Sequence, residues 1–274
     1  MYNFKVDKES IGEAEQWYKG LTGGQPIAVP GSWNDQIEGL HNYLGTVWYQ
    51  TEVIVPHSWA SERIFLRIGS ANYAAKVWIN GKPLGMHEGG HLPFAFELSS
   101  HIQWGEANRI TIQMENELRA DRVPLGNVKA AMRNFPATNY DFFPYGGLHR
   151  DVVLYTAPKV GRLTDVTITT ALDGTVALKI EKQGKASGGK VTIKDATGKR
   201  FTKSFSFTDD VAHTTIQLPD VKLWSPENPY LYTTTVELTG NNKTVDAYSC
   251  QTGVRTVAVS DQGQLLLNGK PIKL

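Results

Sequence analysis

The sequence lacks the features that would place the protein in a membrane or a disulfide-bonded framework. Its 274 residues include one cysteine, Cys250, which excludes an internal disulfide and a cysteine-based zinc site. No apolar run approaches the roughly 18 residues that span a bilayer. The N-terminal residues also lack the apolar run of a signal peptide. We therefore expect the chain, as written, to be cytoplasmic and to have no membrane partner.

Neither sign of charge is in excess, and helical patterns are scarce. Lys and Arg together number 28 and Asp and Glu 27, which gives a formal net charge of +1. This balance gives no electrostatic reason to expect a nucleic-acid partner. Helical periodicity is weak throughout, and only residues 11–21 could hold one short helix.

Short strand patterns are abundant in the first part of the chain. Turn residues are frequent, with 26 Gly and 13 Pro, and aromatic residues make up 10% of the chain. Asn80-Gly81 between two apolar runs predicts a tight hairpin, since both central positions of its turn need positive φ. A segment of few periodic apolar positions, residues 117–145, predicts a long loop, and such loops are often functional. The predicted strands are residues 47–55, 63–68, 76–79, 94–98, 109–114 and 150–155.

A junction at residues 158–163 separates this part from a second series of smaller strands. Their spacing is typical of an immunoglobulin-like sandwich. A hairpin around Asn268-Gly269 closes the sequence. The expected organisation is all-β, with domains at residues 1–160 and 161–258 and the hairpin at 259–274. The predicted strands of the second domain are residues 166–170, 176–180, 190–194, 214–218, 232–238 and 244–248.

The residues offer few catalytic or cofactor motifs. His87 and His91 have the spacing of a helical metal pair, but Gly89-Gly90 between them favours a turn. Cys250 lies in a strand pattern, and there is no Gly-x-Ser-x-Gly elbow or glycine-rich phosphate loop. We therefore expect neither a metal nor a cofactor. Asn116-Glu117 matches a dipeptide found at glycosidase acid/base positions, but we interpret it as a strand-end carboxylate.

Residues 139–150 contain the remaining candidate ligand-binding side chains. Asp141 stands among four aromatic residues and is followed by a double glycine and the pair His149-Arg150. Aromatic rings stack on the C–H faces of sugars, and a carboxylate accepts hydrogen bonds from sugar hydroxyls. A plug that folds back onto the core would use the same residues, so both interpretations stay open at this point.

Seven motifs, in order along nearly the whole chain, identify a resemblance. The sequence resembles the N-terminal part of glycoside hydrolase family 2, and most closely its β-glucuronidases. The stretch at 30–36 favours β-glucuronidases over β-galactosidases. The motifs are AVPGSWNDQ at 28–36, VWYQ at 47–50, KVWING at 76–81, HEGGHLPF at 87–94, DFFPYGGLHR at 141–150, LWSPENPYLY at 223–232 and GVR at 253–255.

The resemblance implies a jelly-roll (galactose-binding-like) sugar-binding domain, an immunoglobulin-like β-sandwich, and a (β/α)₈ catalytic barrel. The hairpin at 259–274 would lead into that barrel, which is missing here together with both catalytic glutamates. We therefore expect no catalytic residue in these 274 residues and no activity from them alone. Asp141 is the one expected substrate-binding residue, contacting a β-glucuronide at the mouth of the barrel in cis. His149 and Arg150 are interpreted as structural.

Other interpretations remain. The parent enzyme could be a β-galactosidase or a β-galacturonidase. The chain could instead be a stand-alone carbohydrate-binding module with an exposed aromatic platform, although we favour core or inter-domain positions for the candidate tryptophans Trp33, Trp48, Trp59 and Trp104. A third interpretation is an interaction module that assembles into homo-oligomers.

Overall fold

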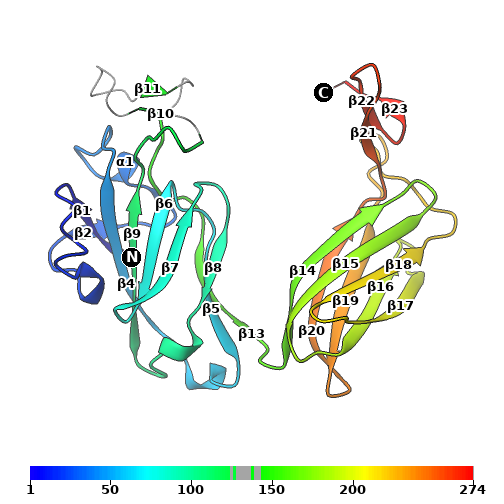
Figure 1. The fold of residues 1–274 in the computed structure, drawn as a ribbon, viewed down its shortest axis with the longest axis horizontal. Coiled ribbons are helices and arrows are strands. Elements are labelled where there is room, and N and C mark those ends of the chain that lie inside the picture. The colour runs from blue at the N-terminus through cyan, green and yellow to red at the C-terminus, as the bar shows by residue number, and fades with distance from the viewer. Residues whose placement is uncertain (124–125, 128–136, 139–142, 274) are drawn as a thin grey trace. The chain divides into compact units, whose positions relative to one another are not determined.

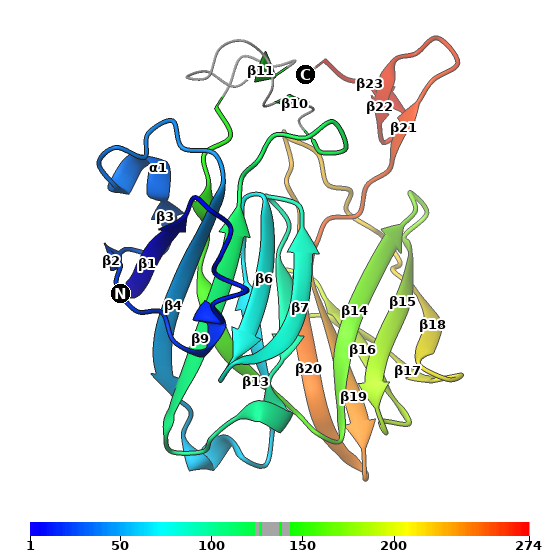
Figure 2. The same cartoon turned by 60° about the vertical axis from the view of Figure 1, so that its left-hand side comes forward.

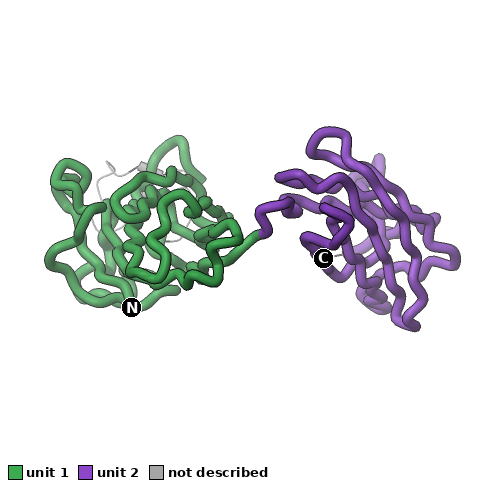
Figure 3. Tube along the Cα trace, turned by 90° about the horizontal axis from the view of Figure 1, so that it is seen from below, with its two compact units in different colours: residues 1–157 green, residues 158–274 purple. Residues whose placement is uncertain are grey.

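The computed structural model describes residues 1–123, 126–127, 137–138 and 143–273 (Figure 1). The chain divides into two compact units, Met1–Ala157 and Pro158–Leu274 (Figure 3). The described parts of both units are built from strands, which confirms the all-β prediction. No helix in these described ranges is long and apolar enough to cross a membrane.

The first unit is a jelly-roll sandwich whose larger sheet has six strands. Figure 2 shows β4, β9, β6 and β7 side by side in this sheet. The order of the larger sheet is β2 (Gln25–Ile27), β1 (Tyr2–Asp7), β4 (Thr46–Ile54), β9 (Ala107–Glu115), β6 (Ala74–Ile79) and β7 (Lys82–Glu88). The smaller sheet contains β13 (Val152–Ala157), β5 (Arg63–Ile68) and β8 (Phe94–Glu97).

The core of this unit lies between the two sheets. Ile64, Leu66 and Ile68 of β5 are all buried, as the alternation predicts. Trp33 and Trp48 are fully buried, and Trp59 and Trp104 pack against the core. The four tryptophans therefore do not form an exposed sugar-stacking platform, and the core interpretation is confirmed for Trp33 and Trp48.

A segment at residues 8–24, here called the strap, covers the other face of the larger sheet. Trp17 and Leu21 of the strap pack on Trp48 and Trp78 of the sheet in a second, smaller cluster. Residues 11–21, which could hold one short helix, contain a single 3₁₀ turn at Trp17–Lys19, and the rest of the strap runs through turns. Trp17 and Leu21 are buried against the sheet although most of the strap is not helical.

The hairpin predicted at Asn80-Gly81 is confirmed. β6 pairs antiparallel with β7, and the two central residues have φ values of 50° and 77°. The Asn80 side chain adds to the turn, since its Oδ1 accepts a hydrogen bond from Arg109 N at 2.8 Å.

The second unit is an immunoglobulin-like sandwich of two sheets around its own core. Sequence patterns missed β17, in which only Phe205 is buried. Cys250 lies on β20, as expected. The sheets are β14 (Gly161–Thr170), β15 (Thr175–Gly184) and β18 (Val211–Gln217); and β17 (Arg200–Ser206), β16 (Gly188–Lys194), β19 (Tyr232–Gly240) and β20 (Lys243–Thr252).

The hairpin at the end of the second unit is confirmed. β21 (Val257–Val259), β22 (Leu265–Leu267) and β23 (Lys270–Pro271) form a small sheet. Asn268 and Gly269 take φ values of 52° and 76° at its turn. The Asn268 side chain ties the hairpin to the sandwich, donating to Trp224 O at 3.0 Å and accepting from Thr256 N at 3.0 Å.

Candidate functional site

Asp141, the predicted substrate-binding residue, lies outside the described residues, as does Phe142. The chain on either side of it is described, and these two segments locate the candidate site. Residues 116–123, which follow β9, are here called the entry stem, and residues 143–149 the exit stem. Between them the short strands β10 (Gly126–Asn127) and β11 (Ala137–Thr138) pair antiparallel.

The exit stem docks on the segment that carries the PGSWN sequence. β12 (Gly147–Leu148) pairs with β3 (Gly31–Ser32), just before the short helix α1 (Trp33–Gln36). Trp33 N donates to Gly146 O at 3.1 Å. A Cβ on Gly146 would lie 1.9 Å from Cζ2 of the fully buried Trp33. Two of the motifs that carry the resemblance thus pack directly on each other, and the close approach requires glycine.

Two buried asparagines complete this docking. Asn34 Oδ1 accepts from Gly146 N at 2.8 Å, while its Nδ2 donates to Leu40 O at 2.8 Å. Asn116 Nδ2 donates to Pro144 O at 3.0 Å. Asn116 directly follows the last residue of β9, so the Asn116-Glu117 dipeptide begins the entry stem at a strand end.

The aromatic residues of the exit stem are only partly covered. The Phe143 ring lies 5.0 Å from Tyr145, and the His41 ring lies 6.3 Å from Phe143 and 6.4 Å from Tyr145. His149 Nε2 donates to Tyr145 O at 3.0 Å. Desolvation of its ring lowers the pKa of His149, and the hydrogen bond to Tyr145 O partly opposes this. Phe143, Tyr145 and His149 therefore give shape to the stem.

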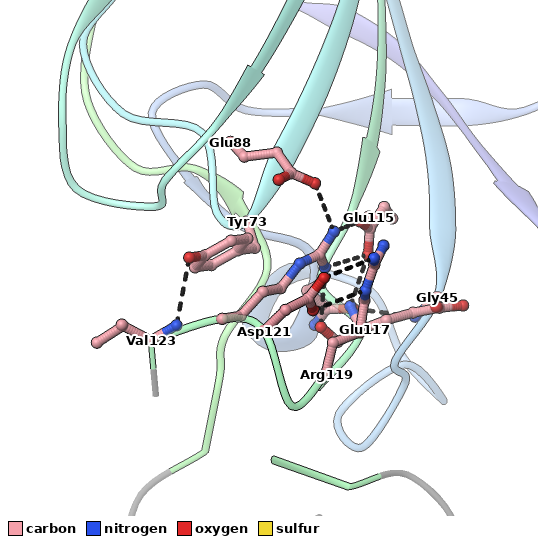
Figure 4. A network of polar contacts seen from close by, with 10 residues as sticks. Gly45, Tyr73, Glu88, Glu115, Glu117, Arg119, Asp121 and Val123 are labelled. Carbon is pink, nitrogen blue, oxygen red and sulfur yellow. Dashed lines mark hydrogen bonds and ion pairs between the residues drawn. The ribbon is translucent and has the colours of Figure 1, made fainter. Parts of the chain in front are cut away.

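Arg122 organises the entry stem, and no local sequence signal indicated it. Its side chain is 4% exposed although it is charged. Nη1 donates to Glu115 Oε2 and to Glu117 O, both at 2.9 Å, and Nη2 contacts Glu115 Oε1 and Glu88 Oε1, the latter at 3.1 Å. Figure 4 shows Glu88, Glu115 and Tyr73 gathered in this network. Burial lowers the pKa of Arg122, but the Glu115 and Glu88 carboxylates outweigh it and raise the pKa above its usual value.

The two stems border a cavity of about 280 Å³. The exposed area of its walls is mainly apolar, and the polar residues that line it are Asn72, His91, Asn116, Glu117, Arg122 and His149. Such a surface suits the face of a sugar or another flat ring. The residues that line it include Tyr73, Leu118, Val123, Phe143, Tyr145 and His149.

The histidine pair noted in the sequence takes part in packing. His87 stacks on Phe94 with ring centroids 4.2 Å apart, and His91 O accepts from Arg150 Nη1 at 3.1 Å. Within the part of the chain that the structure describes, no three His, Cys, Asp or Glu side chains are grouped to hold a metal ion.

Comparison with known proteins assigns both units. Residues 1–158 match the model of "Glycosyl hydrolases family 2, sugar binding domain", and residues 161–255 match that of "Glycosyl hydrolases family 2". The β-glucuronidase of Sus scrofa is 38% identical over 99% of this chain, and that of Paenibacillus borealis is 35% identical over 98%. The chain spans about half the length of the curated relatives it matches, 46% in both cases.

Solved structures agree with these matches. The β-glucuronidase of Bifidobacterium dentium, complexed with coumarin-3-O-glucuronide, superimposes with a TM-score of 0.88 at 31% identity. That comparison covers 98% of this chain and 49% of the other. The β-glucuronidase of Ruminococcus gnavus in complex with D-glucuronic acid gives a TM-score of 0.87 at 28% identity, covering 100% and 48%.

Proposed function

Because the chain belongs to glycosyl hydrolase family 2, we propose that its 274 residues form the sugar-binding and immunoglobulin-like units of a retaining β-glucuronidase. The main support is that β-glucuronidases from animals and bacteria match it over almost its full length. The proposed substrates are terminal β-D-glucuronides, and the proposed partner is a (β/α)₈ catalytic barrel in the same polypeptide.

In this proposal the chain contributes recognition, and the barrel carries out bond cleavage. Retaining hydrolysis uses two carboxyl groups about 5–5.5 Å apart, one as nucleophile and one as general acid and then base. Both would come from the barrel. Asp141 would accept hydrogen bonds from sugar hydroxyls, which are strong when the acceptor is ionised. The stems that flank Asp141 are anchored through buried Asn34, Asn116 and Arg122, and this rigid support favours precise placement of a ligand contact.

The first test is to sequence the source gene beyond codon 274. We expect an open frame that continues into a barrel with an Asn-Glu acid/base motif and a second glutamate. A stop codon with no barrel in the frame would contradict the proposal, and sugar binding by the chain itself would become the function to measure.

The second test uses the enzyme expressed from that frame. Asp141→Asn should lower kcat/KM for a β-glucuronide by about tenfold or more, because a charged hydrogen-bond acceptor to the sugar is lost. The matching β-galactoside and β-galacturonide serve as controls for substrate class. A preference for either of these would replace the glucuronide in the proposal.

A further inference from the structure

We infer that the outer face of one sheet of the immunoglobulin-like unit binds an acidic polysaccharide. The sheet consists of β17, β16, β19 and β20 (Figure 1). Every residue of this face belongs to the described part of the chain, and all of them come from the second unit. The inference goes beyond the proposed function, and its test requires no hydrolysis.

The pairing register arranges the outward side chains of this sheet in three rows, here called the polar grid. Val191 and Ile193 of β16 and Val236 and Leu238 of β19 are buried in the core, so the residues between them point outward. Ala247 is the one apolar member of the grid. The rows are Arg200, Lys194, Thr233 and Gln251; Thr202, Thr192, Thr235 and Ser249; and Ser204, Lys190, Glu237 and Ala247.

The first row places two cations directly opposite each other. Lys194 and Arg200 are paired on neighbouring strands, and both are exposed. Like charges in this arrangement destabilise a sheet. Asp195, the next residue in the chain, does not offset them, because its Oδ1 accepts from Thr197 N, Thr197 Oγ1 and Lys199 N at 2.9, 2.7 and 2.9 Å. An anionic group over Lys194 and Arg200 would offset their repulsion.

The third row adds no net charge to the grid. Lys190 Nζ lies 2.9 Å from Glu237 Oε2, so these two charges balance each other. Within the described residues, no carboxylate forms an ion pair with Lys194 or Arg200. The positive charge of the grid is therefore concentrated at the first row.

The middle row is a line of hydroxyl groups that crosses all four strands. The Oγ1 atoms of Thr192 and Thr202 are 3.3 Å apart, and Thr235 Oγ1 lies 2.8 Å from Ser249 Oγ. A hydroxyl carries one donor and two lone pairs, so each of these groups can form further hydrogen bonds. Sugar hydroxyls also donate and accept. A line of hydroxyls beside two cations therefore suits a chain of sugars that carries carboxylates.

The distribution of charge and the absence of rings from the grid favour this ligand over other polyanions. Residues 158–274 contain 15 Lys and Arg and 11 Asp and Glu, a formal net charge of +4. Residues 1–157 contain 13 and 16, a net charge of −3. The grid has no aromatic side chain on which a nucleic-acid base could stack. It also has no large apolar side chain to enter a membrane.

The test is binding of a fluorescently labelled oligogalacturonate to the 274-residue chain, measured by fluorescence anisotropy. We expect saturable binding that weakens as salt is added, because exposed charges are screened. Lys194→Gln combined with Arg200→Gln should lower the affinity by about tenfold or more, since charged hydrogen bonds to carboxylates are lost. Lys185→Gln combined with Lys270→Gln is the matched control, which removes the same charge from exposed positions outside the grid. It should change the affinity by less than about twofold.

A second pair of substitutions tests the hydroxyl row without changing the charge. Thr192→Val combined with Thr235→Val keeps β-branched side chains that suit a strand. It should lower the affinity for oligogalacturonate by about fivefold, because neutral hydrogen bonds are weaker than charged ones. Duplex DNA is the competing polyanion. Binding of DNA as tight as that of the oligogalacturonate would overturn the inference in favour of a general attraction for anions.

Stability without ligand separates a binding role from a folding role. Arg200→Gln removes the like-charge pair, so its urea midpoint should rise at low salt, whereas Lys185→Gln should leave the midpoint unchanged. A lower midpoint in Arg200→Gln would show that the pair supports the fold and would overturn the inference. The absence of saturable binding by the parent chain, or equal losses in the two lysine and arginine double variants, would overturn it as well.

Discussion

At the scale of single residues, Asp7 anchors the strap. Its carboxylate is 2% exposed and accepts three hydrogen bonds, from Ile11 N, Gly12 N and Trp48 Nε1, each at 2.9 Å. Asp7→Ala leaves these three donors without a protein partner. We expect a loss of about 3 kcal/mol in the free energy of unfolding, measured by urea denaturation.

Two variants serve as controls for Asp7→Ala. Asp7→Asn keeps one side-chain oxygen as an acceptor and should lose less stability. Glu9→Ala changes an exposed carboxylate in the same strap and should lie within about 0.5 kcal/mol of the parent. A loss in Asp7→Ala no larger than that of Glu9→Ala would contradict the anchoring role.

Tyrosine burial predicts how stability depends on alkaline pH. Burial raises the pKa of Tyr2 to about 12, above the value near 10 of an unfolded chain. The folded state therefore holds this proton more tightly, and its contribution to stability is fully present below about pH 10. It should be lost as the pH rises from about 10 to about 12. Urea unfolding between pH 9 and 12 would show the decline.

The matched variants for this pH dependence are Tyr2→Phe and Tyr248→Phe. Tyr2→Phe removes the titrating hydroxyl and should make the decline shallower. Tyr248 is 51% exposed, and its replacement should leave the decline unchanged. Equal slopes in the parent and in Tyr2→Phe would rule out Tyr2 as a source of the pH dependence.

At the scale of elements, the contact between the exit stem and the α1 segment depends on glycine. A Cβ at Gly146 would overlap the indole of Trp33, which is fully buried and has little room to move. Gly146→Ala should therefore lower the free energy of unfolding by about 2–3 kcal/mol in urea. Gly20→Ala is the control, since a Cβ there has no heavy atom within 4 Å. Similar effects of the two substitutions would show that the contact at Trp33 is loose.

The elements also show which parts of the fold a sequence can predict. Alternation located β5 with its observed bounds, because every second side chain enters the core. It missed β17, an edge strand of its sheet whose side chains are mostly exposed. The weak helical pattern at 11–21 corresponds to one 3₁₀ turn, and the packing of Gly12 directly against Trp48 and Asp7 is a tertiary contact that local periodicity does not record.

The candidate site was predictable as a region and not as a set of contacts. The DFFPYGGLHR motif at 141–150 indicated the region that includes the exit stem. Its docking depends on Asn34 bound to Gly146, residues 112 positions apart in the chain. Arg122 gave no signal because its partners Glu88 and Glu115 come from two different strands. Each of these residues looks like an ordinary surface residue until the sheet brings them together.

At the scale of the whole molecule, we expect the 274-residue polypeptide to be catalytically silent. Retaining hydrolysis needs one carboxyl as nucleophile and another as proton donor across the same sugar. In the candidate site, the carboxylates of Glu88 and Glu115 both bind the Arg122 guanidinium. In the proposed function, both catalytic glutamates belong to a barrel outside these residues.

The measurement is hydrolysis of a fluorogenic β-glucuronide by the purified chain, made in a host that has no β-glucuronidase of its own. The release rate should equal that of a mock preparation taken through the same columns. Activity that elutes with the chain and falls in Asp141→Asn would contradict the expectation, because it would require a catalytic pair within these residues. Activity that elutes separately from the chain and is unchanged by Asp141→Asn would come from the host. If the polypeptide is silent and the longer frame is active, cleavage depends on the barrel and the 274 residues serve recognition.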